Sequence, residues 1–205
     1  IGLELKGEAT PKIPKPGEAG WSAISLPWMA FGYGINVTPM QTLTYYNSVA
    51  NNGVMVKPQL VSEIKKWNTT IKKFDTQVMN PRVCSPETLK KVRAILENVV
   101  KRGTAKSLYT KEFPMAGKTG TAQMGYGSKT GSGMYYASSF VGYFPANKPQ
   151  YTCIVMVHRP NTAHNNYYGA DVAGPVFKRI AQKIFTDAPS TNTIRKIDRK
   201  IPKQE

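Results

Sequence analysis

The residues best suited to chemistry stand together in one short run, Gly117 to Gln123. The run contains Gly-Lys-Thr, which ends the phosphate-binding pattern G-x-x-x-x-G-K-[ST]. A phosphate loop would need a glycine at position 112, but Glu112 stands there and its carboxylate would repel phosphate. It would also need a helix after Thr119, where another glycine and β-favouring residues follow. The sequence therefore does not support a phosphate loop.

A β-strand is the better interpretation of this run. Period-2 alternation would put Lys118 and Gly120 on one face, so that a cation points at a site and the bare Gly120 lets a neighbouring element approach closely. Thr119 and Thr121 would offer hydroxyl groups to a substrate carboxylate, and the Thr121 backbone amide would face a developing oxyanion. A structural strand with an exposed lysine is the simpler alternative for Lys-Thr-Gly taken alone.

The composition describes a globular and strongly basic chain. Its 205 residues are 40% hydrophobic and 10% aromatic, which is enough for a buried core and argues against disorder. Lysine and arginine number 28 against 12 acidic residues, a net charge of +16 that would attract polyanions. No recognised nucleic-acid motif accompanies this charge, so we expect no nucleic-acid partner.

No stretch approaches the roughly 20 apolar residues of a membrane span. The chain begins without an initiating methionine or a leader pattern, so we expect Ile1 to be an internal residue of a longer protein.

Cysteines and histidines give no metal-ligand pattern, so no metal or cofactor is expected. Cys153 lies in an apolar run and is interpreted as a small core residue, with a disulfide to Cys84 as the alternative in an oxidising compartment. We expect His158 and His164 to occupy surface or loop positions.

The first half of the chain predicts an extended Pro-rich segment, two helices and a hairpin. Residues 1–20 favour an extended segment because prolines recur among them. One helix begins at Thr38-Pro39 and ends at Gly53, with an apolar stripe of Met40, Leu43, Tyr46 and Ala50. The runs 60–67 and 71–74 predict a hairpin that turns at 68–70. A second helix begins at Ser85-Pro86 and ends before Gly103, with Leu89, Val92, Leu96 and Val99 on one face.

The second half predicts an antiparallel meander of three strands, at 115–123, 135–144 and 151–159. A final helix over 172–185 would direct Val172, Val176, Ile180 and Ile184 toward that sheet. Residues 1–186 would then form the folded unit and residues 187–205 a basic, solvated tail.

Several short motifs occur in an order that resembles the C-terminal part of a class B penicillin-binding protein, and more closely the cell-division type. They cover nearly everything from about residue 20 to 186: Phe31-Gly32-Tyr33-Gly34, Val37-Thr38-Pro39-Met40-Gln41, Ala50-Asn51-Asn52-Gly53, Gly103-Thr104-Ala105, Ala116 to Gln123, Ser139 to Pro145, Tyr167-Tyr168-Gly169 and Ala173 to Phe177.

This resemblance implies an α/β (α+β) fold in which helices cover an antiparallel sheet of five strands. It implies a D,D-transpeptidase, with no cofactor, whose serine attacks the D-Ala-D-Ala end of a peptidoglycan stem peptide. Thr119, Gly120 and Thr121 would bind the substrate, Lys118 would assist through its charge, and the Thr121 amide would form half of the oxyanion hole. β-Lactams would acylate the same serine, and division proteins are candidate partners. The protein would act at the periplasmic face of the bacterial inner membrane, anchored by a segment outside this chain.

Two catalytic signatures of the family, S-x-x-K and S-x-N, are not found where the resemblance requires them. Ser62-Glu63-Ile64-Lys65 lies in a strand-like run, and Ser190-Thr191-Asn192 lies in the tail. A second Lys-Thr-Gly at 129–131 is flanked by glycines and is interpreted as a turn. We therefore expect the serine and its lysine to precede Ile1, and this chain alone to be inactive. We also expect uncovered apolar surface and an unpaired strand edge, which favour self-association. A non-catalytic envelope module of the same fold remains the alternative.

Overall fold

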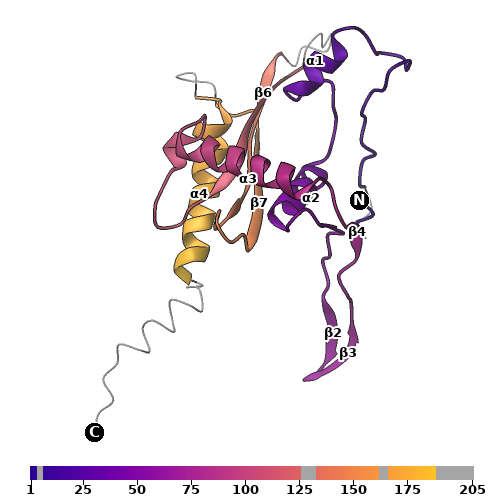
Figure 1. Cartoon of the computed structure of the whole chain (residues 1–205), viewed down its shortest axis with the longest axis vertical. Helices are drawn as coiled ribbons and strands as arrows, with labels where there is room; N and C mark the ends of the chain where they lie inside the picture. Colours follow the sequence, from indigo (N-terminus) through magenta and orange to yellow (C-terminus); the bar gives the residue numbers. More distant parts are fainter. Residues whose placement is uncertain (4–6, 126–132, 162–165, 188–205) are drawn as a thin grey trace.

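The structure is a computed structural model that describes residues 1–3, 7–125, 133–161 and 166–187. The second Lys-Thr-Gly, His164, Ser190-Thr191-Asn192 and the predicted tail beyond Asp187 lie outside the described residues. Figure 1 shows a sheet with helices packed on it and a hairpin that projects away from this body. In chain order the elements are α1 (Ser25–Ala30), α2 (Pro39–Ala50), β1 (Met55–Val56), β2 (Glu63–Lys66), β3 (Thr69–Lys73), β4 (Val78–Asn80), α3 (Pro86–Lys101), a 3₁₀ turn η1 (Lys106–Leu108), β5 (Ala116–Met124), β6 (Tyr135–Phe144), β7 (Tyr151–His158) and α4 (Gly169–Asp187).

The main sheet is the predicted antiparallel meander, with strand order β5-β6-β7. Its register pairs Lys118 with Val141 and Thr121 with Ser138, and Val141 in turn pairs with Ile154. Each observed strand lies within one residue of its predicted bounds. Among the described residues, no further strand pairs with the outer edge of β5 or of β7.

Both long N-terminal helices begin where the capping signals predict. Thr38 and Gln41 form a reciprocal capping box, in which Gln41 N donates to Thr38 Oγ1 at 3.2 Å and Thr38 N donates to Gln41 Oε1 at 2.9 Å. Ser85 caps α3 by accepting from Thr88 N at 3.1 Å.

The buried face of α2 is more polar than its apolar stripe predicts. Its fully buried residues are Thr44, Ser48 and Val49, whereas the predicted stripe is only half-buried. The Thr44 hydroxyl donates to Met40 O at 2.8 Å and the Ser48 hydroxyl donates to Tyr45 O at 2.7 Å. Burying these two hydroxyl groups costs little free energy because each keeps a hydrogen bond.

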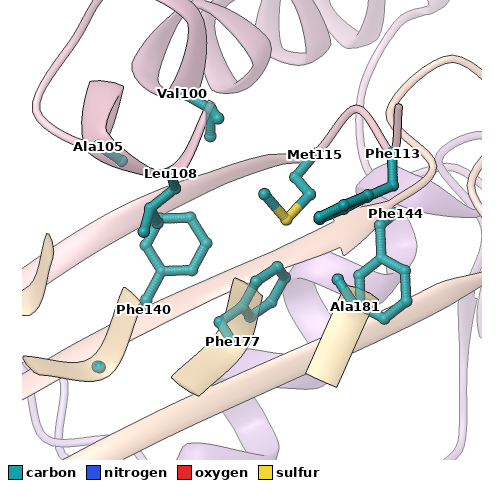
Figure 2. Packing of buried hydrophobic residues seen from close by; sticks show 10 residues of the cluster. Val100, Ala105, Leu108, Phe113, Met115, Phe140, Phe144, Phe177 and Ala181 are labelled. Atoms are coloured by element: carbon teal, nitrogen blue, oxygen red, sulfur yellow. The ribbon is translucent and has the colours of Figure 1, made fainter. Parts of the chain in front are cut away.

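One face of the sheet packs on α4 through a cluster of aromatic side chains (Figure 2). Phe177 of α4 is fully buried and meets Phe140 edge-on, with ring centroids 4.7 Å apart, and Phe144 at 5.6 Å. Val100 of α3, Leu108 of η1 and Met115 complete this core. This core supports the N-terminal end of β5 on the face of the sheet that packs on α4.

The prediction of which α4 residues face the sheet is partly wrong. Ala173, Phe177 and Ala181 face the sheet, whereas Val176 is 44% exposed and Ile180 is 37% exposed. Small residues allow the helix to lie close to the strands, so the branched residues turn outward. Val172 is half-buried, and Ile184 packs at the margin of the core.

The opposite face packs on α2 and α3. Val49, Leu89, Leu96 and Ala116 surround Tyr143, which has no exposed surface. Burial raises the pKa of Tyr143 to about 12. The sheet is therefore covered on both sides, as an α/β arrangement requires.

The β2–β3 hairpin is confirmed, but its turn differs from the prediction. Trp67 and Asn68 connect the strands, and Thr69 and Thr70 already belong to β3. Ser62 and Lys65, which match the spelling S-x-x-K, are exposed residues of this hairpin region and are not on a helix. Their spacing therefore cannot place them side by side as it would on a helix turn.

Both cysteines are free thiols, so the alternative of a disulfide is not realised. Cys153 packs against the aromatic core, as predicted, and burial raises the pKa of its thiol. His158 is exposed. No helix among the described residues is both long and apolar enough to cross a membrane.

Candidate active site

Strand β5 carries the run that the sequence singled out and presents it at the open edge of the sheet. Lys118 is exposed, and its Nζ donates to the backbone carbonyl of Thr119 at 2.9 Å. Its cross-strand neighbour is Val141 of β6. A cation therefore stands on a firmly paired strand, beside a strand edge that can accept an extended peptide.

The hydroxyl of Thr119 meets the segment that follows α3. Thr119 Oγ1 and Thr104 Oγ1 lie 3.1 Å apart and share a hydrogen bond. The next residue, Ala105, is fully buried and holds this segment against the core. Sequence reasoning noted Gly103-Thr104-Ala105 only as a motif, and its contact with β5 was missed.

The start of α4 closes on the middle of β5, which bears out the expected close approach at Gly120. A Cβ on Gly169 would lie 2.6 Å from Gly120 O, and a Cβ on Gly120 would lie 2.4 Å from Ser139 Oγ. Gly169 N donates to Thr121 Oγ1 at 3.0 Å, which leaves the Thr121 O–H available to a ligand. Gly169 has no room for a side chain because the atoms around it belong to the backbone, whereas a side chain at Gly120 would displace the Ser139 hydroxyl.

The side chains of the run alternate across the strand. Register places Thr119 and Thr121 on the side of Phe140 and α4, and Lys118 on the side of Val141. The structure therefore brings the predicted site residues together along one strand edge, not on one face.

Aromatic side chains gather beside the C-terminal part of β5, and sequence reasoning did not assign them to the site. The rings of Tyr136 and Tyr167 stack with centroids 3.9 Å apart, and Tyr168 lies 4.6 Å from Tyr167. The hydroxyl of Ser138 donates to Tyr167 O and fixes this segment to β6. The cluster forms because the residues before α4 lie against β6, although the two segments are far apart in the sequence.

A second aromatic group reaches β5 from the N-terminal part of the chain. Gln123 N donates to Tyr33 Oη at 3.3 Å. The Tyr33 ring lies 5.6 Å from the rings of both Trp28 and Phe31. Phe31-Gly32-Tyr33-Gly34 is thereby tied to the end of the strand that carries Lys118.

No group of three or more His, Cys, Asp or Glu residues in the described part of the chain could hold a metal ion. What the edge of β5 offers is a cation, hydroxyl groups and backbone amides, which suit a substrate with a carboxylate and a polarised carbonyl.

Comparison with known families decides the classification. The model of the penicillin-binding protein transpeptidase domain matches residues 1–182. The chain belongs to the penicillin-binding protein transpeptidase family. The peptidoglycan D,D-transpeptidase FtsI of Buchnera aphidicola is 34% identical over 165 residues, which cover 80% of this chain and 27% of that protein. The stage V sporulation protein D of Bacillus subtilis is 30% identical over 206 residues, covering 95% of this chain and 30% of that protein.

Solved transpeptidase structures agree. Penicillin-binding protein 3 of Mycobacterium tuberculosis, in its apo form, superposes with a TM-score of 0.72 at 28% identity, covering 91% of this chain and 43% of that one. Penicillin-binding protein 2B of Streptococcus pneumoniae gives a TM-score of 0.71 at 24% identity, covering 91% of this chain and 30% of that one, and supports the fold. This transpeptidase chain spans less than a third of the length of the two curated relatives named above.

Proposed function

We propose that this chain forms one wall of the active site of a serine-type peptidoglycan D,D-transpeptidase. The observation that carries the proposal is the open edge of β5, where Lys118, Thr119 and Thr121 stand on a strand held by Thr104 and Gly169. Membership of the transpeptidase family and relatives named D,D-transpeptidases support the same reaction.

Each residue of β5 has a defined task in this proposal. The hydroxyls of Thr119 and Thr121 donate to the terminal carboxylate of a D-Ala-D-Ala stem peptide, and the Thr121 N–H donates to the oxyanion. The charge of Lys118 stabilises the negative charge that develops at the reacting centre. Gly120 leaves room for Ser139 and for the start of α4 to lie close to the strand that binds the substrate.

The nucleophilic serine and its lysine are supplied by residues outside this chain. The serine Oγ attacks the carbonyl carbon of the penultimate D-Ala, and the terminal D-Ala leaves with a proton. An amine of a second stem peptide then attacks the acyl-enzyme, forms the cross-link and frees the serine. β-Lactams imitate D-Ala-D-Ala and acylate the same serine.

The setting we propose is the periplasmic face of the bacterial inner membrane, with anchorage through a segment outside this chain and with division proteins as partners. Relatives named peptidoglycan D,D-transpeptidase FtsI and stage V sporulation protein D support a role in building peptidoglycan. A non-catalytic envelope module of the same fold is the rival, and the names of the relatives favour the enzyme.

Labelled penicillin tests the proposal directly. The full-length protein should form a covalent adduct with it and should release D-Ala from a stem pentapeptide when an amine acceptor is present. The isolated 205-residue chain should form no adduct, because we expect the nucleophilic serine to lie outside it. A full-length protein that binds stem peptide but is never acylated would favour the non-catalytic module.

A further inference from the structure

The β2–β3 hairpin extends well away from the body that carries β5 (Figure 1). At its tip stands Trp67, which is 91% exposed and has a positive φ of 55°. Tryptophan is usually largely buried, and residues other than glycine rarely adopt this backbone conformation. The turn therefore holds a bare indole ring out into solvent, where it contributes little to the core.

The hairpin is also strongly basic. Residues 63–73 contain four lysines and one glutamate, a net charge of +3. Glu63 is already paired, since Lys65 Nζ lies 2.7 Å from it and the Thr70 hydroxyl donates to it at 3.1 Å. Lys66 and Lys73 form no ion pair within the described part of the chain, so their charge is free to meet an anionic ligand.

A groove of about 460 Å³ lies at the base of the hairpin. Its lining includes the apolar residues Leu60, Val61, Ile64 and Phe74. Its charged lining residues are two lysines and one acid, Lys57, Lys73 and Asp75. No residue of β5 lines this groove, so it is separate from the candidate active site. Its size suits a short peptide branch beside a longer polymer.

We propose that the β2–β3 hairpin is a docking site for a peptidoglycan strand, an anionic polymer of sugars and short peptides. Trp67 stacks on the face of a sugar ring, Asn68 and Thr69 bond sugar hydroxyl and amide groups, and the lysines pair with stem-peptide carboxylates. This inference rests on the proposed function, because peptidoglycan is the polymer that the enzyme would cross-link. Docking away from β5 would raise the local concentration of stem peptides at the active site.

A membrane surface fits the hairpin less well. Interfacial anchors combine basic residues with a continuous apolar face. Here the indole of Trp67 is followed by Asn68 and Thr69 and preceded by Lys66, so it has polar neighbours in the turn. Ile64 and Ile71 of the hairpin are also exposed, but Ile64 lies opposite Lys72 and Ile71 stands at the register shift, so they do not extend the ring into a continuous apolar face. Hydrogen-bonding side chains around one flat ring suit a sugar better than a hydrocarbon layer.

Co-sedimentation with purified, insoluble peptidoglycan tests the proposal on the full-length protein. Trp67→Ala should weaken binding roughly tenfold, and Trp67→Phe should restore part of it because a flat ring remains. Lys66→Gln combined with Lys73→Gln should weaken binding and reduce its dependence on salt. The charge-matched control, Lys90→Gln with Lys148→Gln, removes two exposed lysines elsewhere and should bind like the wild type.

The outcomes separate the hairpin from the active site. If all variants are acylated by labelled penicillin at the wild-type rate but bind peptidoglycan equally well, the docking site is wrong and the proposed function stands. If the wild type is not acylated, the proposed function itself fails. Binding to phosphatidylglycerol vesicles that survives Trp67→Leu, without binding to peptidoglycan, would assign the hairpin to a membrane surface and overturn the inference.

Discussion

Gly169 N, at the first residue of α4, donates to Thr121 Oγ1 of β5 at 3.0 Å. Gly169 also packs so closely against β6 that a Cβ atom added to it would lie 2.3 Å from Ser139 O. The helix that covers the back of the sheet therefore also sets the position of the strand that carries the candidate site.

Gly169→Ala should disturb this junction. The added methyl group meets backbone atoms that cannot rotate away, so α4 or β5 must shift. We expect a loss of about 1–3 kcal/mol in the free energy of unfolding, measured by urea denaturation. Gln182→Ala, an exposed change on the same helix, should stay within about 0.5 kcal/mol of the wild type. Equal stability of the two variants would show that the contact at Gly169 is not tight.

Phe177→Ala should be more costly. Phe177 is fully buried between Phe140 and Phe144, and its removal leaves a cavity in the hydrophobic cluster of Figure 2. Such changes typically cost about 3–5 kcal/mol. Phe185→Ala is the matched control, because that ring is 46% exposed and should lose much less stability in the same denaturant series. A similar loss for both variants would contradict the assigned core.

Local signals in the sequence predicted much of this fold. Thr38-Pro39 and Ser85-Pro86 supply their own caps, and the three strands of the meander have strong β-propensity between clear turns. Such signals involve residues close together in the sequence, so they can be recognised without knowledge of the tertiary structure. The predicted role of Gly120 as a point of close approach is confirmed for the same reason, since a missing side chain is visible in the sequence.

The features that the sequence predicted wrongly, or did not predict, depend on contacts between segments that are far apart in the chain. Ile180 turns outward because Ala173 and Ala181 allow α4 to approach the sheet, and a count of branched residues cannot show this. The Tyr136–Tyr167 ring stack and the hydrogen bond between the Thr104 and Thr119 hydroxyls join residues whose proximity only the folded chain reveals. The substrate roles of Lys118, Thr119 and Thr121 stay predictions.

Tyr143 should make stability depend on pH in the alkaline range. Burial raises its pKa from 10.0 to about 12, so the folded state holds the phenolic proton more tightly than the unfolded state. The free energy of unfolding should therefore fall as pH rises from 10 toward 12, by about 2 kcal/mol from this group. Tyr143→Phe should remove that component, whereas Tyr109→Phe, at a residue 43% exposed, should not. If the free energy of unfolding fell equally with pH in the wild type and in Tyr143→Phe, Tyr143 would not be the group responsible.

The isolated chain should self-associate. The outer edge of β7 has no strand partner among the described residues, and Val176 and Ile180 of α4 expose apolar surface. Light scattering should show oligomers of the 205-residue chain and a monomer of the full-length protein. Val176→Lys combined with Ile180→Lys should shift the isolated chain toward monomer. A compact monomer at high concentration, melting as cooperatively as the full-length protein, would mean that the chain closes its own core.

The Lys-Thr-Gly of β5 can belong to the active site only if it, and not the second Lys-Thr-Gly, takes part in acylation. The most direct test is the rate at which labelled penicillin acylates the full-length protein carrying Lys118→Ala or Lys129→Ala. Lys118 stands on a paired strand, whereas Lys129 lies in a glycine-rich segment that is not expected to fix a side chain. We predict that Lys118→Ala slows acylation about 100- to 1000-fold while Lys129→Ala has little effect. Equal slowing by the two substitutions, or none by Lys118→Ala, would contradict the assignment of β5 to the active site.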